Sequence, residues 1–296
     1  AVAANNTLVA SSNAVGEIKF WNLADGADRY GIAGHVGPVH SLAFHPDNTR
    51  VASAGADGTI RVWKVPVAPQ SIAAHTKPVH DVALSPNGTI VATAAADNLI
   101  KLWNPVNGAA LRQLAGHTAP VRRVAFDAAG SQIATADAEG SVRLWNPANA
   151  AALGVIGAHV GPVNAAAFGK QFLVTAGADG TAKFWQLPIA PPKVVAGHTA
   201  AVNAVAIAED ATIVITGGAD KKVQVINANT GAAQRSLAGH PDPITSVALS
   251  KTKALTAAGG AAGVIRFWNT ADGADRLSLH GHVGAIHGVA IHPQEN

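Results

Sequence analysis

A histidine that follows Gly or Ala recurs along the chain every 39 to 42 residues, and this repeat limits the possible folds more than any other feature. The copies are His35, His75, His117, His159, His198, His240 and His282. Each precedes an alternating apolar run, a turn, a short strand with Ser or Thr, a tight Asp/Gly turn, a strand that in most copies ends in Trp, and a further short strand. Four short strands per period are typical of a propeller blade, so the sequence predicts an all-β fold built from antiparallel strands.

The repeat boundaries divide the chain into six internal blades and a seventh shared by the two ends. The internal blades span about 35–74, 75–116, 117–158, 159–197, 198–239 and 240–281. The closing blade, 282–296 plus 1–34, takes one strand from Ile286 to Ile291 and three strands from before His35. We expect one seven-bladed, four-stranded-per-blade domain over 1–296, because closure of a ring removes exposed sheet edges.

The Gly-His pairs and the strand-ending tryptophans resemble the WD40-repeat family over essentially the whole chain. The tryptophans are Trp21, Trp63, Trp103, Trp145, Trp185 and Trp268. The Trp-Asp pair usual in the family is mostly Trp-Asn here, as at Trp21-Asn22. The resemblance implies a seven-bladed propeller that acts as a non-enzymatic scaffold.

A recurring Ser/Thr, His and Asp set has the composition of a nucleophilic triad. Catalysis needs one exposed site rather than a set repeated around a ring, so we reject that interpretation. The WD40 resemblance implies instead a buried hydrogen-bonded chain from Trp through Ser/Thr and His to Asp. Three blades carry the full set: His35, Ser53, Asp57 and Trp63; His75, Thr93, Asp97 and Trp103; His159, Thr175, Asp179 and Trp185.

Four blades depart from this set, and we expect them to be tied less firmly. The departures are Glu139 in the Asp position beside His117, Thr135 and Trp145; Ile226 in the Trp position beside His198, Thr216 and Asp220; Ala262 in the Asp position beside His240, Thr256 and Trp268; and Val15 in the Asp position beside Ser11, Trp21 and His282.

A basic residue stands two positions before most of the tryptophans. The row consists of Lys19, Arg61, Lys101, Arg143, Lys183 and Arg266. Two interpretations stay open: a solvated strand face that blunts sheet edges, or a basic belt for an anionic partner.

The family places partner contacts at the rim and mouth of the ring, and two of the implied rows are small. They are Pro38, Pro78, Pro120, Pro162, Ala201, Pro243 and Ala285, three after each His, and Ala56, Ala96, Ala138, Ala178 and Ala219, before the turn acid. Neither row has the Trp, Tyr or Arg typical of interface hot spots.

The residue five after each His is polar in every blade. This mouth row consists of His40, His80, Arg122, Asn164, Asn203, Thr245 and His287. In ring order, His287, His40, His80 and Arg122 form an arc of titratable and cationic groups. Three interpretations are open: a hydrated polar lining, a contact arc for an acidic peptide or protein, and a metal site, for which separate blades place the ligands too far apart. By strand alternation Asp81 should point away from His80.

Composition narrows the chemistry further. With 48% hydrophobic and 13% charged residues the chain can bury a large core, and the formal net charge of +3 includes no basic run suited to nucleic acid. Zero Cys excludes disulfides, thiolate metal sites and a Cys nucleophile. No apolar stretch is long enough to span a membrane, and no export signal pattern starts the chain. We interpret His45, His280 and His292 as surface residues.

Three classes of function are compatible with these features. The first is a non-enzymatic scaffold that binds a protein or peptide at the rim or mouth, with an acidic partner favoured by the basic arc, and with no cofactor, metal, nucleic acid or membrane. The second is a structural or engineered propeller, or a domain of a larger bacterial-type protein, with no ligand of its own. The weakest is an enzyme or metal site at the channel mouth. We expect a monomer. The compartment is open: the family favours the cytoplasm, and the absence of Cys also suits an exported protein.

Overall fold

The computed structural model describes residues 8–22, 28–46, 49–64, 69–187, 193–280 and 284–291. These residues form strands and no helix, and so none of them belongs to a helix that could cross a membrane. The chain divides into two compact units, Ala1–Ile156 and Gly157–Asn296.

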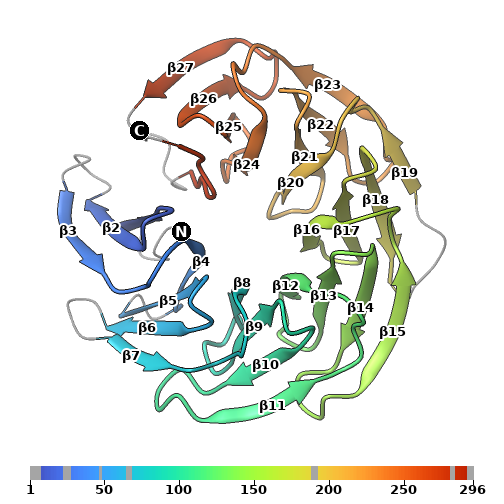
Figure 1. The fold of residues 1–296 in the computed structure, drawn as a ribbon. Coiled ribbons are helices and arrows are strands. Elements are labelled where there is room, and N and C mark those ends of the chain that lie inside the picture. The colour runs from blue at the N-terminus through green and yellow to red at the C-terminus, as the bar shows by residue number, and fades with distance from the viewer. Residues whose placement is uncertain are drawn as a thin grey trace. The chain divides into compact units, whose positions relative to one another are not determined.

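The first unit contains one three-stranded sheet and three four-stranded sheets, each antiparallel with its strands in chain order (Figure 1). The strands are β1 (Leu8–Ser12), β2 (Glu17–Asn22) and β3 (Asp28–Ala33); β4 (Val39–Phe44), β5 (Arg50–Gly55), β6 (Ile60–Lys64) and β7 (Pro69–Ile72); β8 (Val79–Leu84), β9 (Val91–Ala95), β10 (Ile100–Trp103) and β11 (Ala110–Leu114); and β12 (Val121–Phe126), β13 (Ile133–Asp137), β14 (Ser141–Trp145) and β15 (Ala152–Gly157).

The second unit contains three four-stranded antiparallel sheets of the same order. The strands are β16 (Val163–Phe168), β17 (Phe172–Gly177), β18 (Thr181–Gln186) and β19 (Lys193–Ala196); β20 (Val202–Ile207), β21 (Ile213–Gly218), β22 (Val223–Asn227) and β23 (Ala233–Leu237); and β24 (Ile244–Leu249), β25 (Leu255–Gly260), β26 (Val264–Asn269) and β27 (Asp275–His280). Seven successive antiparallel sheets confirm the predicted all-β, seven-bladed fold class.

The first strands of neighbouring sheets lie side by side within each unit. In the first unit β4 contacts β8 and β8 contacts β12, and in the second β16 contacts β20 and β20 contacts β24. The core lies between successive sheets, where Ala52 and Ile60 of one sheet pack with Val79, Val91 and Trp103 of the next. The many alanines allow this close sheet-to-sheet packing.

The segment expected to complete the closing blade follows the predicted blade order but is not paired as a strand. The three N-terminal strands form a sheet of their own, and residues 284–291 lie outside any strand. Ile286 is held against the sheet of β24: its N–H donates to Gly260 O at 3.1 Å, and its carbonyl accepts from Thr245 Oγ1. A Cβ atom on Gly259 would lie 2.6 Å from Ile286 Cγ2, so the absence of a side chain there allows this contact.

A β-bulge interrupts the first strand of every four-stranded sheet. The pairing shifts between Val39 and Ser41, Val79 and Asp81, Val121 and Arg123, Val163 and Ala165, Val202 and Ala204, and Ile244 and Ser246. The skipped residue is in each case the polar residue of the mouth row. A bulge leaves one residue outside the ladder and redirects its side chain, which explains why this position is polar within an apolar strand.

Candidate functional site

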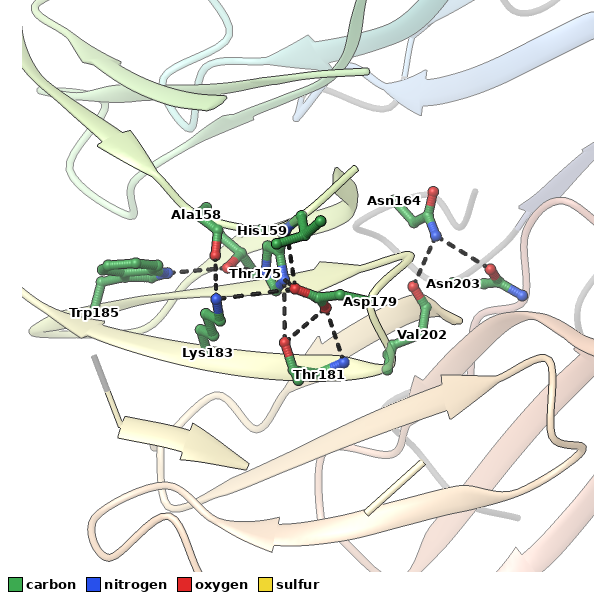
Figure 2. A network of polar contacts seen from close by, with 11 residues as sticks. Ala158, His159, Asn164, Thr175, Asp179, Thr181, Lys183, Trp185, Val202 and Asn203 are labelled. Atoms are coloured by element: carbon green, nitrogen blue, oxygen red, sulfur yellow. Dashed lines mark hydrogen bonds and ion pairs between the residues drawn. The ribbon is translucent and has the colours of Figure 1, made fainter. Parts of the chain in front are cut away.

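The sheet of β16–β19, which we name after the preceding His159, contains a buried chain of hydrogen bonds, as Figure 2 shows. The other sheets are named in the same way after the histidine that precedes them. Trp185 Nε1 donates to Thr175 Oγ1 at 3.0 Å, and Thr175 Oγ1 lies 2.8 Å from His159 Nε2. His159 Nδ1 lies 2.9 Å from Asp179 Oδ1. The Asp179 carboxylate also accepts from the Val160 N–H and from both the N–H and the hydroxyl of Thr181. The chain therefore joins the loop after His159 to the turn between β17 and β18.

The sheets of His35 and His75 contain the same contacts. His35 lies 2.7 Å from Ser53 Oγ and 3.0 Å from Asp57, while Trp63 donates to Ser53 at 2.8 Å. In the next sheet the corresponding contacts join His75 to Thr93 and Asp97 at 2.7 and 3.0 Å, and Trp103 to Thr93 at 3.0 Å.

Burial determines the protonation state of the histidine rings in these hydrogen-bonded series. Burial lowers the pKa of His35, His75 and His159, against the opposing effect of the Asp partner, so each ring is held neutral. A neutral ring donates from Nδ1 to the Asp and accepts at Nε2 from the Ser/Thr hydroxyl. Ser53 is fully buried (0% exposed) and its hydroxyl is committed to His35. That arrangement suits a structural link rather than a nucleophile.

The sheet of His117 is complete, contrary to the sequence prediction. His117 Nδ1 lies 2.7 Å from the carboxylate of Asp137, which is buried at the end of β13. Asp137 also accepts the N–H groups of Glu139 and Ser141 at 3.0 and 2.9 Å. Glu139 itself is exposed. The acid thus comes from two residues earlier than the position expected, and the prediction that Glu139 stands in for it is wrong.

The sheet of His198 lacks only the tryptophan. His198 contacts Asp220 at 2.9 Å and Thr216 at 2.9 Å. Ile226 fills the tryptophan position and is 1% exposed. The series of hydrogen bonds therefore ends at Thr216 in this sheet.

In the sheet of His240, the hydrogen-bonded chain is interrupted on both sides of the His240 ring. Thr256 does not occupy the hydroxyl position. Register pairs Ala258 with Arg266, as Ser53 pairs with Arg61, so Ala258 occupies the hydroxyl position. Thr256 instead hydrogen-bonds Thr270 at 2.8 Å. His240 Nε2 is buried without a hydrogen-bond partner among the described residues, and its Nδ1 lies 2.9 Å from the carbonyl of Asp242. Trp268 donates to Ala238 O at 3.2 Å.

The three-stranded sheet of β1, β2 and β3 retains one hydrogen bond of this series. Trp21 Nε1 donates to Ser11 Oγ at 2.8 Å. Val15, at the Asp position, is 79% exposed. His282 lies outside the described residues.

Three members of the basic row, Lys101, Lys183 and Arg266, cap the loop that carries the histidine. Lys101 Nζ donates to Ala74 O at 2.7 Å and Lys183 Nζ to Ala158 O at 2.6 Å; Ala74 and Ala158 directly precede His75 and His159. Gln224 makes the same contact with Gly197 O at 3.0 Å, and Arg266 with Gly239 O. The cations of Lys19, Lys101 and Arg266 lie 5.6 to 6.0 Å from the ring of the Trp that follows. Loop capping is a role that neither sequence interpretation included.

The two small rim rows are joined to each other. The N–H of the residue before each turn donates to the carbonyl of the residue three after the His, at 2.8 to 3.0 Å. The pairs are Ala56 and Pro38, Ala96 and Pro78, Ala138 and Pro120, Ala178 and Pro162, Ala219 and Ala201, and Ala261 and Pro243. Ala285 is exposed.

In the second unit the mouth row bridges successive first strands. Asn164 Nδ2 donates to Val202 O at 3.0 Å and to Asn203 Oδ1 at 3.3 Å (Figure 2). Asn203 Nδ2 donates to Ile244 O at 2.8 Å, and Thr245 Oγ1 to Ile286 O. Each side chain reaches the carbonyl just before the next member of the row. His287, the last member, is exposed.

In the first unit the mouth row gathers nitrogen-rich side chains, which we name the basic bulge row: His40, His80 and Arg122. The rings of His40 and His80 are 5.9 Å apart. Burial, and then His40, Arg122 and Arg123, lower the pKa of His80 to about 4. Burial and the neighbouring Arg123 also lower the pKa of Arg122. Among the described residues, His80 makes no bridge to β12, the next first strand of this unit, whereas Asn164 and Asn203 do bridge to the strands that follow them.

The remaining histidines divide between core and surface. His45, expected at the surface, is 9% exposed because its ring packs between turns and its Nε2 lies 2.7 Å from Gly88 O. His280 is exposed, and His292 lies outside the described residues. No group of three or more His, Asp or Glu side chains in the described part of the chain is arranged to hold a metal ion.

The model of the WD domain, G-beta repeat, matches residues 28–64, 68–104, 108–146, 151–186, 190–227 and 231–269. The chain belongs to the WD40 repeat family. Each WD40 match begins near the outermost strand of one sheet and ends near the third strand of the next, so it is offset from the sheets by one strand.

Curated WD40 relatives match short segments. DDB1- and CUL4-associated factor 13 of Dictyostelium discoideum is 42% identical over 57 residues, 19% of this chain and 13% of that protein. Transducin beta-like protein 3 of Rattus norvegicus is 36% identical over 64 residues, 21% and 8% of the two chains. Coronin-7 of Homo sapiens is 35% identical over 69 residues, 23% and 7% of the two chains. The matches thus span a small part of these relatives. WD40 proteins are typically non-enzymatic interaction scaffolds.

Proposed function

We propose that this WD40 protein is a non-enzymatic scaffold that binds an acidic peptide or protein segment through the basic bulge row. The observation that carries the proposal is the contrast between the two units. Asn164 and Asn203 spend their side chains on bonds to the next strand. His80 occupies the same bulge position without such a bridge to β12 among the described residues, and the side chains of His80 and Arg122 are both partly exposed.

The electrostatics of the row favour an anion. Arg122 and Arg123 are adjacent cations, and their mutual repulsion contributes to the lowered pKa of Arg122. A carboxylate placed between Arg122 and His80 would relieve that repulsion and accept charge-assisted hydrogen bonds. Charge complementarity of this kind sets partner choice and association rate. An extended acidic segment lying across β4, β8 and β12 is the partner that fits these groups.

The test is binding of a fluorescent oligoglutamate peptide, followed by anisotropy at low ionic strength. Arg122→Glu and His80→Ala should each weaken binding, with the charge reversal costing about tenfold or more. Arg112→Glu is the matched control, since Arg112 is exposed on the outermost strand β11 and lies outside the row. Added salt should weaken binding by wild type. Equal affinities for wild type and Arg122→Glu would reject the proposal.

One observation favours a second candidate, a structural module with no ligand of its own. Both rim rows are small, and their backbone groups are paired with each other, as at Ala56 N and Pro38 O. That leaves few side chains at the rim for contact with a partner. Absence of any oligoglutamate binding, together with failure of an acidic peptide array to give signal, would favour this candidate over the scaffold.

A further inference from the structure

One carboxylate joins three successive first strands in the first unit. Asp81, on β8, accepts the hydroxyl of Ser41 on β4 at 2.7 Å. Its second oxygen accepts the N–H of Val124 on β12 at 3.1 Å. The Val82 N–H adds a third bond at 3.0 Å. The single side chain therefore fixes β8 to the strands on both of its sides.

No other described first strand carries an acid at this position, six residues after the His. The equivalents are Ser41, Arg123, Ala165, Ala204 and Ser246. In the second unit the row residues themselves bridge the strands, as Asn164 and Asn203 do. In the first unit Asp81 makes the bridge from one residue further along, outside the row.

We propose that Asp81 is the positioning residue of the basic bulge row. This inference rests on the proposed function for the meaning of the row. The bonds of Asp81 fall next to each member: Ser41 follows His40, Asp81 follows His80, and Val124 lies two after Arg122. By fixing these three backbone points, Asp81 sets the spacing at which the row meets an acidic segment.

The charges around Asp81 come from all three strands. Arg123 on β12 attracts the carboxylate, while burial raises the pKa of Asp81. The other charged or titratable groups at the row are Arg122 on β12, His80 on β8 and His40 on β4.

The test follows the His80 ring by NMR titration in wild type and in Asp81→Asn. The Asn side chain keeps the size but presents an N–H group where one oxygen accepted a bond. If the row spreads, His80 becomes more hydrated and its titration midpoint should rise from about 4 towards 6.5. Loss of a negative charge at Asp81 would lower the midpoint, and replacement of a carboxyl that is already protonated near this pH would leave it unchanged. A rise therefore separates positioning from simple electrostatics. Oligoglutamate affinity should fall about tenfold.

Two further variants provide a second test of the positioning role of Asp81 and a control. Ser41→Ala removes only the β4 bond, should fold, and should raise the His80 midpoint by less than Asp81→Asn; it decides the matter if Asp81→Asn does not fold. Asp210→Asn alters an exposed carboxylate paired with Lys253 in the second unit and should leave His80 unchanged. A folded Asp81→Asn with an unchanged or lowered His80 midpoint overturns the positioning role, as does an unchanged midpoint in Ser41→Ala where that variant decides. If wild type fails to bind oligoglutamate, the proposed function fails while the His80 titration still decides the role of Asp81.

Discussion

Asp137 Oδ2 accepts a hydrogen bond from His117 Nδ1 at 2.7 Å, from a position two residues before the one that carries Asp57 or Asp179 in other sheets. The same carboxylate accepts the N–H groups of Glu139 and Ser141. It therefore links the His loop to the turn, as the turn Asp does elsewhere, although it projects from the end of the strand.

Asp137→Ala should lower the free energy of unfolding by about 2–3 kcal/mol, because it leaves His117 and two N–H groups without their acceptor. Glu139→Ala is the matched control and should change stability by no more than about 0.5 kcal/mol, since Glu139 is exposed. Urea denaturation of both variants measures the difference. A larger effect from Glu139→Ala than from Asp137→Ala would contradict the assignment.

The sequence predicts the repeats and strands well because turn residues and alternating apolar runs act locally. It places the polar links less well because positions two apart on a strand share a face. Thr256 and Ala258 are therefore equivalent by spacing, and only the register separates them. Asp137 ends β13 and Glu139 lies in the turn after it, so the contact with His117 decides between these two acids. The bridges of Asp81 depend on neighbouring sheets and on a bulge, neither of which the local sequence reveals.

Ala258→Ser should restore the missing link in the sheet of His240. A hydroxyl at Ala258 would face His240 Nε2, which is buried without a partner, and should stabilise the fold by about 0.5–1.5 kcal/mol. Ala257→Ser is the control: Ala257 is equally buried on the opposite strand face, so its hydroxyl should destabilise. Thermal or urea denaturation compares the two. Equal destabilisation by both variants would count against the assignment of Ala258.

Acidification should weaken the fold in two steps. Burial lowers the pKa of His35, His75, His117 and His159 below 6.5 in the folded state. The unfolded chain then binds more protons, so this stability is present above pH 6.5 and is lost as the pH falls below that value. Burial opposes ionisation of Asp57 and Asp179, but hydrogen bonds from Thr59 and His35, and from Thr181 and His159, outweigh it and lower their pKa to about 2. Their contribution is lost as the pH falls from 3.8 towards 2. Urea midpoints across this range give the measurement, and a flat profile between about pH 7 and about pH 5 would refute the first step.

Asn203→Ala should destabilise the second unit by about 1 kcal/mol, because the Ile244 carbonyl loses its donor and Asn164 loses an acceptor. Amide hydrogen exchange should rise along β20 and β24, the strands that Asn203 joins. Asn229→Ala, at an exposed loop position, serves as the control. Unchanged exchange along both strands would show that the bridge contributes nothing to stability.

Variants of the loop-capping residue Lys101 distinguish the contribution of its hydrogen bond to stability from the contribution of its charge. Lys101 donates to Ala74 O, and the neutral amide of Gln224 makes the equivalent bond to Gly197 O. Lys101→Met removes the bond and should cost about 1 kcal/mol, while Lys101→Gln should retain most of the stability, because Gln224 shows that the amide reaches the carbonyl. Urea denaturation at low and high salt tests both variants. If the positive charge were what matters, the two variants would lose equal stability and the loss would shrink with salt; if the bond matters, only Lys101→Met falls, and salt changes little.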